Sequence, residues 1–369
     1  MSATASRPAG PDRGTAGGRD PTAPIQVTAS RVSPAWLAAA VVVLIAVSLA
    51  GVALGPVDLP VIEIMRSALD RLPFVELPSA LTERELTIVW KLRLPRVVLG
   101  GLVGAMLALA GAGYQGVFRN PLADPYLLGI AAGAGAGATL VFAYGGPAAG
   151  GWIDPLPLAA FVGALVGVAG TYLLSRSVTG ERDTVSLILA GVAVAAFFTA
   201  VQTYVQQREA ESLRRVYSWL LGGLPTTGWE QVRLILPYVV IAATVLLLHR
   251  RLLDVLSVGD EEAVTLGVSV VRLRLTVVIA ASLGTAAAVA VSGLIGFVGI
   301  IVPHTGRLLT GGSYRTVLPL SLLFGAAFLI LADLVARSVM APAEIPLGVV
   351  TAFIGAPFFT WLLRHRRPR

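Results

Sequence analysis

Ten long apolar runs are the feature of this sequence that most limits the folds open to it. A helix needs roughly 20 mainly apolar residues to cross the hydrocarbon core of a bilayer, and the runs approach or reach that length. With 56% hydrophobic and only 13% charged residues, the chain also has too few charges for a soluble protein of 369 residues. We therefore predict an all-α integral membrane protein of about ten transmembrane helices, at residues 35–54, 94–118, 127–144, 156–174, 184–205, 229–248, 273–291, 293–309, 317–335 and 345–363.

The arginines predict how these helices are oriented. Loops rich in Lys and Arg stay in the cytoplasm, so the short loops near 145–155 and at Ser292, which carry none, should be external. Both termini are then cytoplasmic, with a disordered tail at 1–33, a ten-helix domain at 34–363 and a basic tail at 364–369. We expect a multi-pass protein of the cell (cytoplasmic) membrane. The inner loops then carry Arg119, Arg176, Arg182, Arg250, Arg251, Arg272, Arg274, Arg307 and Arg315.

Charge and composition exclude several classes of function. The formal net charge of +7 comes from arginines between apolar runs and at the C-terminus, a pattern of membrane topology rather than of a nucleic-acid-binding face. The chain has no cysteine, so it can form neither a disulfide framework nor a thiolate metal site. Lys91 is the only lysine and lies between Trp90 and Leu92, so no phosphate-binding GxxxxGK[ST] loop exists. We predict no cofactor, no metal site and no catalytic residue here; if the function of this chain uses ATP, a separate subunit binds it.

The segment 252–268, with the sequence LLDVLSVGDEEAVTLGV, is long for an inner loop. Asp260, Glu261 and Glu262 favour the start of a short helix, and Gly267 can end it as a C-terminal cap. One interpretation is an interfacial helix that lies on the lipid headgroups. An acidic face would be repelled by an anionic leaflet, however, so a protein partner is the preferred interpretation.

Four polar residues share one face of the fifth predicted span. Thr199, Gln202, Thr203 and Gln206 follow the i, i+3, i+4, i+7 spacing of a helix face. Polar side chains in a span make hydrogen bonds between helices or line a wet pathway. The continuity of the stripe favours a translocation pathway.

Two other classes of function, an ion-coupled secondary transporter and a membrane enzyme, remain to be weighed for a chain of this kind. An ion-coupled secondary transporter would carry carboxylates at mid-membrane, and Asp333 is the only candidate. A multispan membrane enzyme would need a clustered acid, base or metal set, which three separated histidines do not provide. The other polar residues within or near the spans are Gln115, His304 and Glu344, of which His304 and Glu344 fit water-reachable helix caps or loop anchors.

Three long segments resemble one known family. They are RLPRVVLGGLVGAMLALAGAGYQGVFRNPLADPYLLGIAAGAGAG at 93–137, GLIGFVGIIVPHTGRLLTGGSYRTVLPLSLLFGAAFLILADLVAR at 293–337 and PAEIPLGVVTAFIGAPFF at 342–359. They resemble FecCD-type permeases, the type II ABC importers for iron-siderophores, haem and cobalamin. The resemblance extends from about Trp36 to Leu363. It implies ten helices per permease, a homodimer or close heterodimer around one pathway, two cytosolic ATPase subunits and an extracytoplasmic substrate-binding protein.

The resemblance also implies roles for particular residues. Arg93, Arg96 and Arg337 match the arginines that dock the binding protein, and the fifth helix matches the one that lines the pathway. Thr184 fits the position of the cytoplasmic gate, whereas Val185 departs from the family's pattern there. The segment 252–268 resembles the coupling helices that engage the ATPase, through Leu256, Gly259, Asp260, Glu261, Glu262, Ala263, Leu266 and Gly267.

The implied activity is ATP-driven import by alternating access, in which the permease breaks no covalent bond. An iron(III)-siderophore is the expected cargo because it is the commonest in the family, and haem or cobalamin is the alternative.

Overall fold

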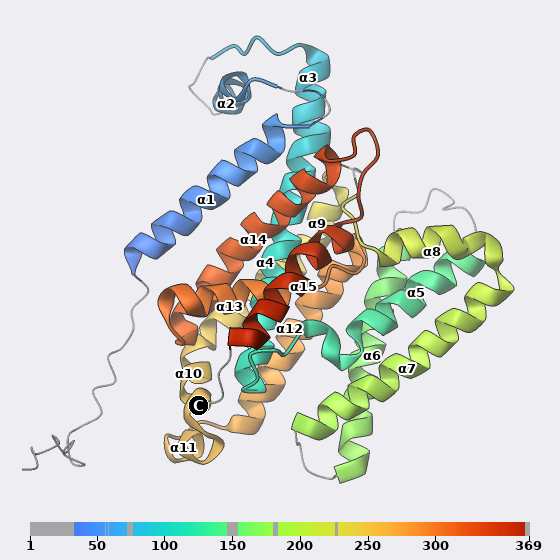
Figure 1. Ribbon diagram of the computed structural model, residues 1–369, viewed down its shortest axis with the longest axis vertical. Coiled ribbons are helices and arrows are strands. Elements are labelled where there is room, and N and C mark those ends of the chain that lie inside the picture. Colours follow the sequence, from blue (N-terminus) through green and yellow to red (C-terminus); the bar gives the residue numbers. More distant parts are fainter. Residues whose placement is uncertain are drawn as a thin grey trace, which may run out of the picture. The chain divides into compact units, whose positions relative to one another are not determined.

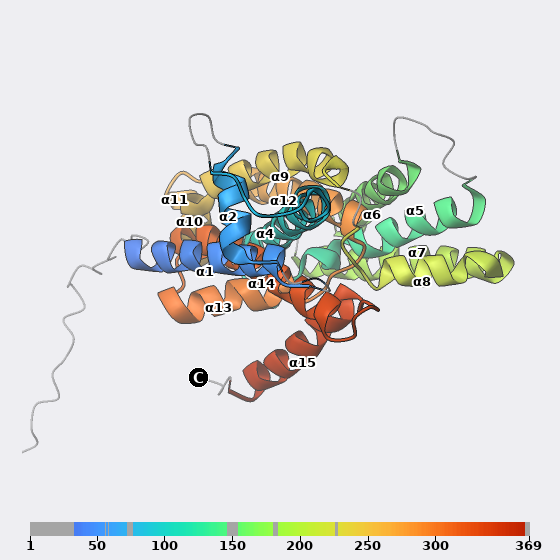
Figure 2. The ribbon, with the colours of Figure 1, turned by 90° about the horizontal axis from the view of Figure 1, so that it is seen from above.

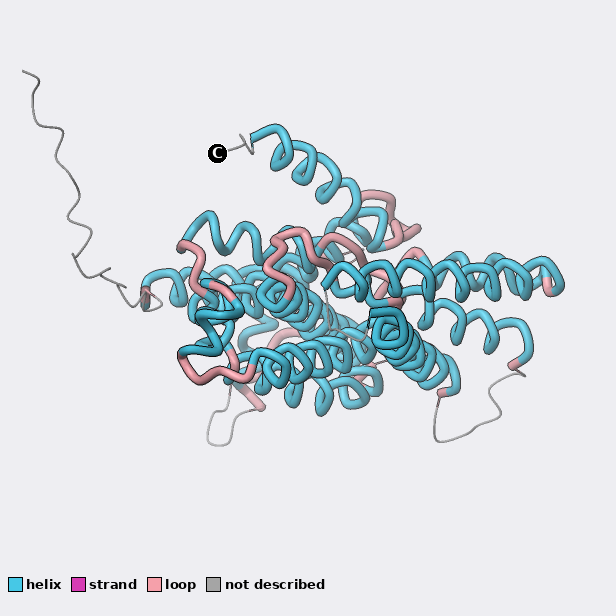
Figure 3. The backbone as a smooth tube through the Cα atoms, turned by 90° about the horizontal axis from the view of Figure 1, so that it is seen from below, coloured by secondary structure: helices cyan, strands magenta, loops and turns pink. Residues whose placement is uncertain are grey.

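The computed structural model describes residues 33–55, 57, 59–71, 77–145, 154–179, 184–225 and 228–365. The tail predicted at 1–33 falls almost wholly outside these residues, as does most of the basic tail at 364–369. In the described part of the chain every regular element is a helix (Figure 3).

All ten predicted spans coincide with helices. Among the described residues, seven helices are long and apolar enough to cross a membrane, while α5, α13 and the apolar part of α15 are shorter. The fold class predicted from the sequence is therefore confirmed. The ten helices are α1 (Pro34–Ala53), α4 (Leu94–Val117), α5 (Ile130–Tyr144), α6 (Pro155–Thr179), α7 (Thr184–Arg208), α9 (Glu230–Leu248), α12 (Val270–Ser292), α13 (Val298–Thr310), α14 (Tyr314–Ser338) and α15 (Leu347–His365).

Shorter helices occupy the connections. A five-residue helix, α3 (Glu83–Thr87), passes into a π-helical stretch (Ile88–Arg93) and then into α4, so that Glu83–Val117 forms one continuous rod of 35 residues. The others are α2 (Val61–Leu69), α8 (Leu213–Leu220), α10 (Arg250–Val258), α11 (Asp260–Thr265) and the 3-10 turns Pro125–Leu128 and Ala210–Ser212.

Helix α4 lies at the centre of the packing, against α14, α12, α13 and α9. Its close approach to α14 depends on small residues, because a Cβ at Gly104 would overlap the carbonyl oxygen of Gly325. Gly133 on α5 and Gly163 on α6 meet in the same way. Close backbone packing replaces the hydrophobic driving force that lipid cannot supply between helices.

Helices α5, α6 and α7 form a second group, which joins the first through α6 and α12 (Figure 2). The outer members of the fold bury little of their surface. On α7, Leu189 and Phe197 are each 65% exposed, and on α15 Phe353 is 76% exposed. These faces need lipid or another protein to cover them.

Two ends of the helix bundle are distinguished below. The Arg96 end holds α2, α3, the start of α4 and the end of α14, whereas the α11 end holds α10 and α11 (Figure 1). Helix α1 runs towards the Arg96 end and α15 runs away from it. Which end faces the cytoplasm stays a prediction from the arginines.

Candidate functional site

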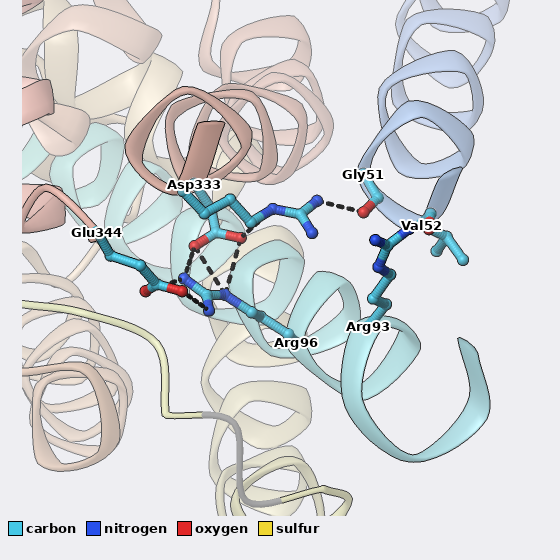
Figure 4. Close-up of polar contacts among 7 residues, drawn as sticks. Gly51, Val52, Arg93, Arg96, Asp333 and Glu344 are labelled. Carbon is cyan, nitrogen blue, oxygen red and sulfur yellow. Dashed lines mark hydrogen bonds and ion pairs between the residues drawn. The ribbon is translucent and has the colours of Figure 1, made fainter. Parts of the chain in front are cut away.

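Arg96 joins two carboxylates at the Arg96 end. It lies in the first turn of α4, and its Nε and Nη2 donate to Asp333 Oδ1 of α14 at 3.0 and 2.8 Å. Its Nη1 and Nη2 donate to the two oxygens of Glu344, in the segment before α15, both at 2.8 Å (Figure 4). The planar guanidinium suits this arrangement because its donors form a rigid fork that matches carboxylates. One side chain thus connects α4, α14 and the start of α15.

Burial separates the members of this group. Arg96 is 6% exposed and Asp333 only 2%, while the Glu344 side chain is 51% exposed. A buried charge is costly unless it is paired, so Asp333 requires the arginines around it. Besides Arg96 it has Arg337, one turn away on α14, with 3.6 Å between Nε and Oδ2.

Arg93 and Arg337 hold the end of α1. Nη1 of Arg93 donates to the carbonyl oxygens of Val52 and Ala53 at 2.9 and 2.8 Å, and its Nη2 donates to that of Val57. Arg337 donates to the carbonyl of Gly51 (Figure 4). The last carbonyls of a helix lack partners within it and attract cations. The two arginines thereby fasten α1 to α4 and α14.

The predicted docking arginines are therefore all less than a tenth exposed and paired within the chain. Docking at these residues stays a prediction. The group of this cluster that does face outwards is the Glu344 carboxylate. Hydrogen bonds from Arg96 lower the pKa of Glu344 below its ordinary value of 4.5, so it is ionised at neutral pH.

At the opposite end, Asp254 of α10 caps the start of α14. Its Oδ1 accepts a hydrogen bond from the Tyr314 backbone N–H at 2.5 Å, and its Oδ2 accepts one from Ser313 Oγ at 2.9 Å. Nε of Arg315 lies 3.3 Å from Oδ2. A carboxylate here satisfies unpaired N–H groups and opposes the helix dipole. The sequence analysis did not single out Asp254, whose partners lie some 60 residues further along the chain.

Asp260, the first residue of α11, forms ion pairs with two other elements. Nη2 of Arg274, at the start of α12, lies 2.9 Å from Oδ1 and 2.8 Å from Oδ2. Nη2 of Arg119, just beyond the end of α4, lies 3.4 Å from Oδ1. The acid thus ties α11 to the ends of two large helices.

The remaining residues predicted to engage an ATPase fall into two groups. Leu256 and Ala263 are fully buried and fix the two short helices against the bundle. Glu261 and Glu262 are exposed, and Leu266 is 68% exposed, so these three form an outward surface with Val264. Gly259 separates α10 from α11, and Gly267, at φ +80°, ends α11 in the left-handed conformation that glycine favours.

The polar stripe of α7 is divided between two environments. Gln202 is 8% exposed and its Nε2 donates to the Ala132 carbonyl of α5 at 3.0 Å, which is a bond between helices. Thr199 and Thr203 are exposed, and Gln206 is half-buried. The pathway interpretation is compatible with the threonines, and Gln202 has a packing role. The side chain of Thr184, the predicted gate, lies outside the described residues.

An apolar groove of about 630 Å³ follows one face of α15. The groove is lined by residues from α8, α15 and the segment between α12 and α13, among them Leu220, Leu294, Phe297, Phe353 and Pro357.

No group of three or more His, Cys, Asp or Glu side chains that could hold a metal ion occurs among the described residues.

Comparison with known proteins identifies close relatives over most of the chain. Residues 41–365 match the model of the FecCD transport family. The cobalamin import system permease protein BtuC of Halobacterium salinarum is 40% identical over an alignment that covers 92% of this chain and 99% of that protein. The Fe(3+) dicitrate transport system permease protein FecD of Escherichia coli is 38% identical, with 76% of this chain and 86% of that protein covered.

A solved structure supports the same relationship. An inward-facing conformation of a metal-chelate type ABC transporter superposes with a TM-score of 0.76 at 30% sequence identity, and the match covers 90% of this chain and 99% of that one. A second structure, PsaBC from Streptococcus pneumoniae, has a TM-score of 0.53 at 18% identity and supports the fold alone.

Proposed function

Because this chain belongs to the FecCD transport family and is a multi-pass membrane permease of an ABC importer, we propose that it carries a metal chelate inwards by alternating access. The single observation that most supports this function is the family match over residues 41–365. A permease of this kind moves its cargo without covalent chemistry. The free energy for transport must then come from a process outside the chain, and a partner that binds two states of the bundle with different affinity can transmit it.

We propose that this partner is a pair of cytosolic ATPase subunits that contact α11. The outward surface of Glu261, Glu262, Val264 and Leu266 supports this assignment, since it combines acids with two apolar side chains that are 62% and 68% exposed. An acidic face would be repelled by anionic lipid, which argues against a helix that lies on the membrane. In this arrangement the α11 end is cytoplasmic.

A substrate-binding protein would deliver the cargo at the Arg96 end. Arg93, Arg96 and Arg337 remain the proposed docking residues, but their burial means that a partner first meets Glu344. A basic side chain of the partner could pair with Glu344 directly. An acidic one would have to replace Glu344 on Arg96, because the Nη1 and Nη2 donors are already directed at it.

A second copy of the chain would complete the translocation pathway. The exposed apolar faces of α7 and α15 support this, together with the groove beside α15. Thr199 and Thr203 on the exposed side of α7 would then line the pathway at the dimer interface.

The proposed cargo is an iron(III) chelate of the siderophore type. Named relatives serve Fe(3+) dicitrate, hemin and iron(3+)-hydroxamate import. Cobalamin is the second candidate, because a relative that matches over 99% of its own length is a cobalamin import permease.

The decisive experiment is reconstitution in liposomes with an ATPase and a substrate-binding protein from the same organism. We expect ATP inside the liposomes to drive accumulation of a ferric siderophore, with cobalamin and haem as competing cargoes that identify the specificity. Accumulation driven by an ion gradient, with no ATPase present, would instead establish a secondary transporter.

A further inference from the structure

The four acids of the α10–α11 segment divide into two inward-facing and two outward-facing residues. Asp254 and Asp260 are paired with residues of the bundle, whereas Glu261 and Glu262 are exposed. Asp260 and Glu261 are neighbours in sequence, so the acidic run is not one uniform surface. This division indicates two different tasks.

The inward pair reaches the same helices that carry the charges of the Arg96 end. Helix α4 begins near Arg96 and is followed by Arg119, which pairs with Asp260. Helix α14 begins at the Asp254 cap and carries Asp333 near its other end. Two continuous helices therefore link the partners of Asp254 and Asp260 to the Arg96 cluster.

The backbone at Arg119 supports a specific role for one of these contacts. Arg119 has φ +48°, in the left-handed region, where a helix usually ends in glycine. A side chain there is unfavourable, so an arginine in this position points to a function of the side chain. Its guanidinium pairs with Asp260.

We propose that Asp254 and Asp260 are positioning residues that transmit the movement of the ATPase contact to α4, α12 and α14. This proposal rests on the proposed function, in which Glu261 and Glu262 belong to the contact itself. The ATPase displaces α11 through its outward surface. Two sets of contacts make the large helices follow this movement: the ion pairs of Asp260 with Arg274 and Arg119, and the cap that Asp254 forms on α14. Without them, α10 and α11 would slide against the bundle.

The exposure of these groups makes the proposal testable apart from folding. The side chains of Asp260 and Arg274 are 38% and 24% exposed, and partly exposed ion pairs contribute little to stability. Their removal should leave the bundle folded while it loosens the link between α11 and α12. Uptake per ATP hydrolysed should therefore change more than thermal stability.

The test compares Asp260→Asn with Glu261→Gln in the complete complex of permease, ATPase and binding protein. Each variant removes one negative charge from the same turn of α11. We expect Asp260→Asn to retain the ATPase on co-purification and to hydrolyse ATP, but to transport at least about fivefold less cargo per ATP. Glu261→Gln should weaken retention of the ATPase. In the complexes that still form, the amount of cargo transported per ATP hydrolysed should be unchanged.

Two further variants separate coupling from a structural role. Asp260→Glu should restore much of the coupling, and exchange of the pair by Asp260→Arg with Arg274→Asp should restore part of it. Asp254→Asn should also lower cargo per ATP. If Asp260→Asn keeps the wild-type ratio of cargo to ATP, or releases the ATPase as Glu261→Gln does, the proposal is wrong. If the wild-type permease retains no ATPase, the proposed function itself fails.

Discussion

The Arg96 end and the α11 end use the same chemistry in different surroundings. Both join acids and arginines from distant parts of the chain, and both involve the ends of α4 and α14. At the Arg96 end the central ion pair is 2% and 6% exposed, whereas at the α11 end the acids are 21% and 38% exposed. Burial makes the charges of the first group depend on one another, because an unpaired buried charge is costly, whereas partial exposure lets water replace a partner in the second.

Replacement of Asp333 should have the largest effect on stability. Asp333→Asn leaves Arg96 and Arg337 buried without their shared carboxylate, which typically costs about 3–5 kcal/mol. Thermal unfolding of the purified permease in detergent measures the loss. Glu344→Gln is the control, since it removes an exposed carboxylate from the same Arg96 and should cost no more than about 1 kcal/mol. Equal losses in the two variants would contradict the contrast between buried and exposed partners.

The Asp254 cap should give an intermediate effect. Asp254→Ala removes the acceptor for Tyr314 N–H and Ser313 Oγ, and the loss of a helix cap costs about 1 kcal/mol. The same unfolding assay detects it. Glu261→Ala, an exposed acid of the neighbouring helix, should stay within about 0.5 kcal/mol of the wild type. A loss at Asp254 as large as that at Asp333 would mean that the α11 end is as rigid as the Arg96 end.

The smallest effect is expected from protonation of Glu344. Its pKa is lowered by the bonds from Arg96, so its contribution is complete above about pH 4.5 and disappears as the pH falls through the lower folded-state pKa. The difference in Tm between wild type and Glu344→Gln should therefore shrink as the pH falls from about 7 to about 3. A difference that stays constant over this range would show that the pair with Arg96 contributes nothing.

The helices of the fold were predictable because each span is an apolar run of about the length that crosses a bilayer. The ten runs all became helices, and the glycines spaced four apart became sites of close packing, as at Gly133 and Gly163. The pairing of these elements was not predictable, since Arg96 and Asp333 are 237 residues apart. Only the spacing of Asp333 and Arg337, four residues apart on one helix, gave a local signal for that cluster.

Periodicity also failed to assign partners to polar faces. It placed Thr199, Gln202, Thr203 and Gln206 on one helix face, but α5 covers Gln202 and leaves the threonines exposed. A run of acids is likewise one feature in the sequence, although Asp260 faces Arg274 and Glu261 faces outwards. Which neighbour covers a residue depends on tertiary packing, and the periodicity of one helix does not reveal which other helices pack against it.

The 35-residue rod from Glu83 to Val117 is longer than a bilayer is thick. At about 1.5 Å per residue it extends roughly 50 Å, against about 30 Å of hydrocarbon. A helix of this length must tilt or extend beyond the hydrocarbon, and the π-helical stretch Ile88–Arg93 interrupts the α-helical hydrogen bonding near one end of it. A partner that tilted the Glu83 end of this helix would move α4 with it, and the motion would reach Arg119, just beyond the other end of α4.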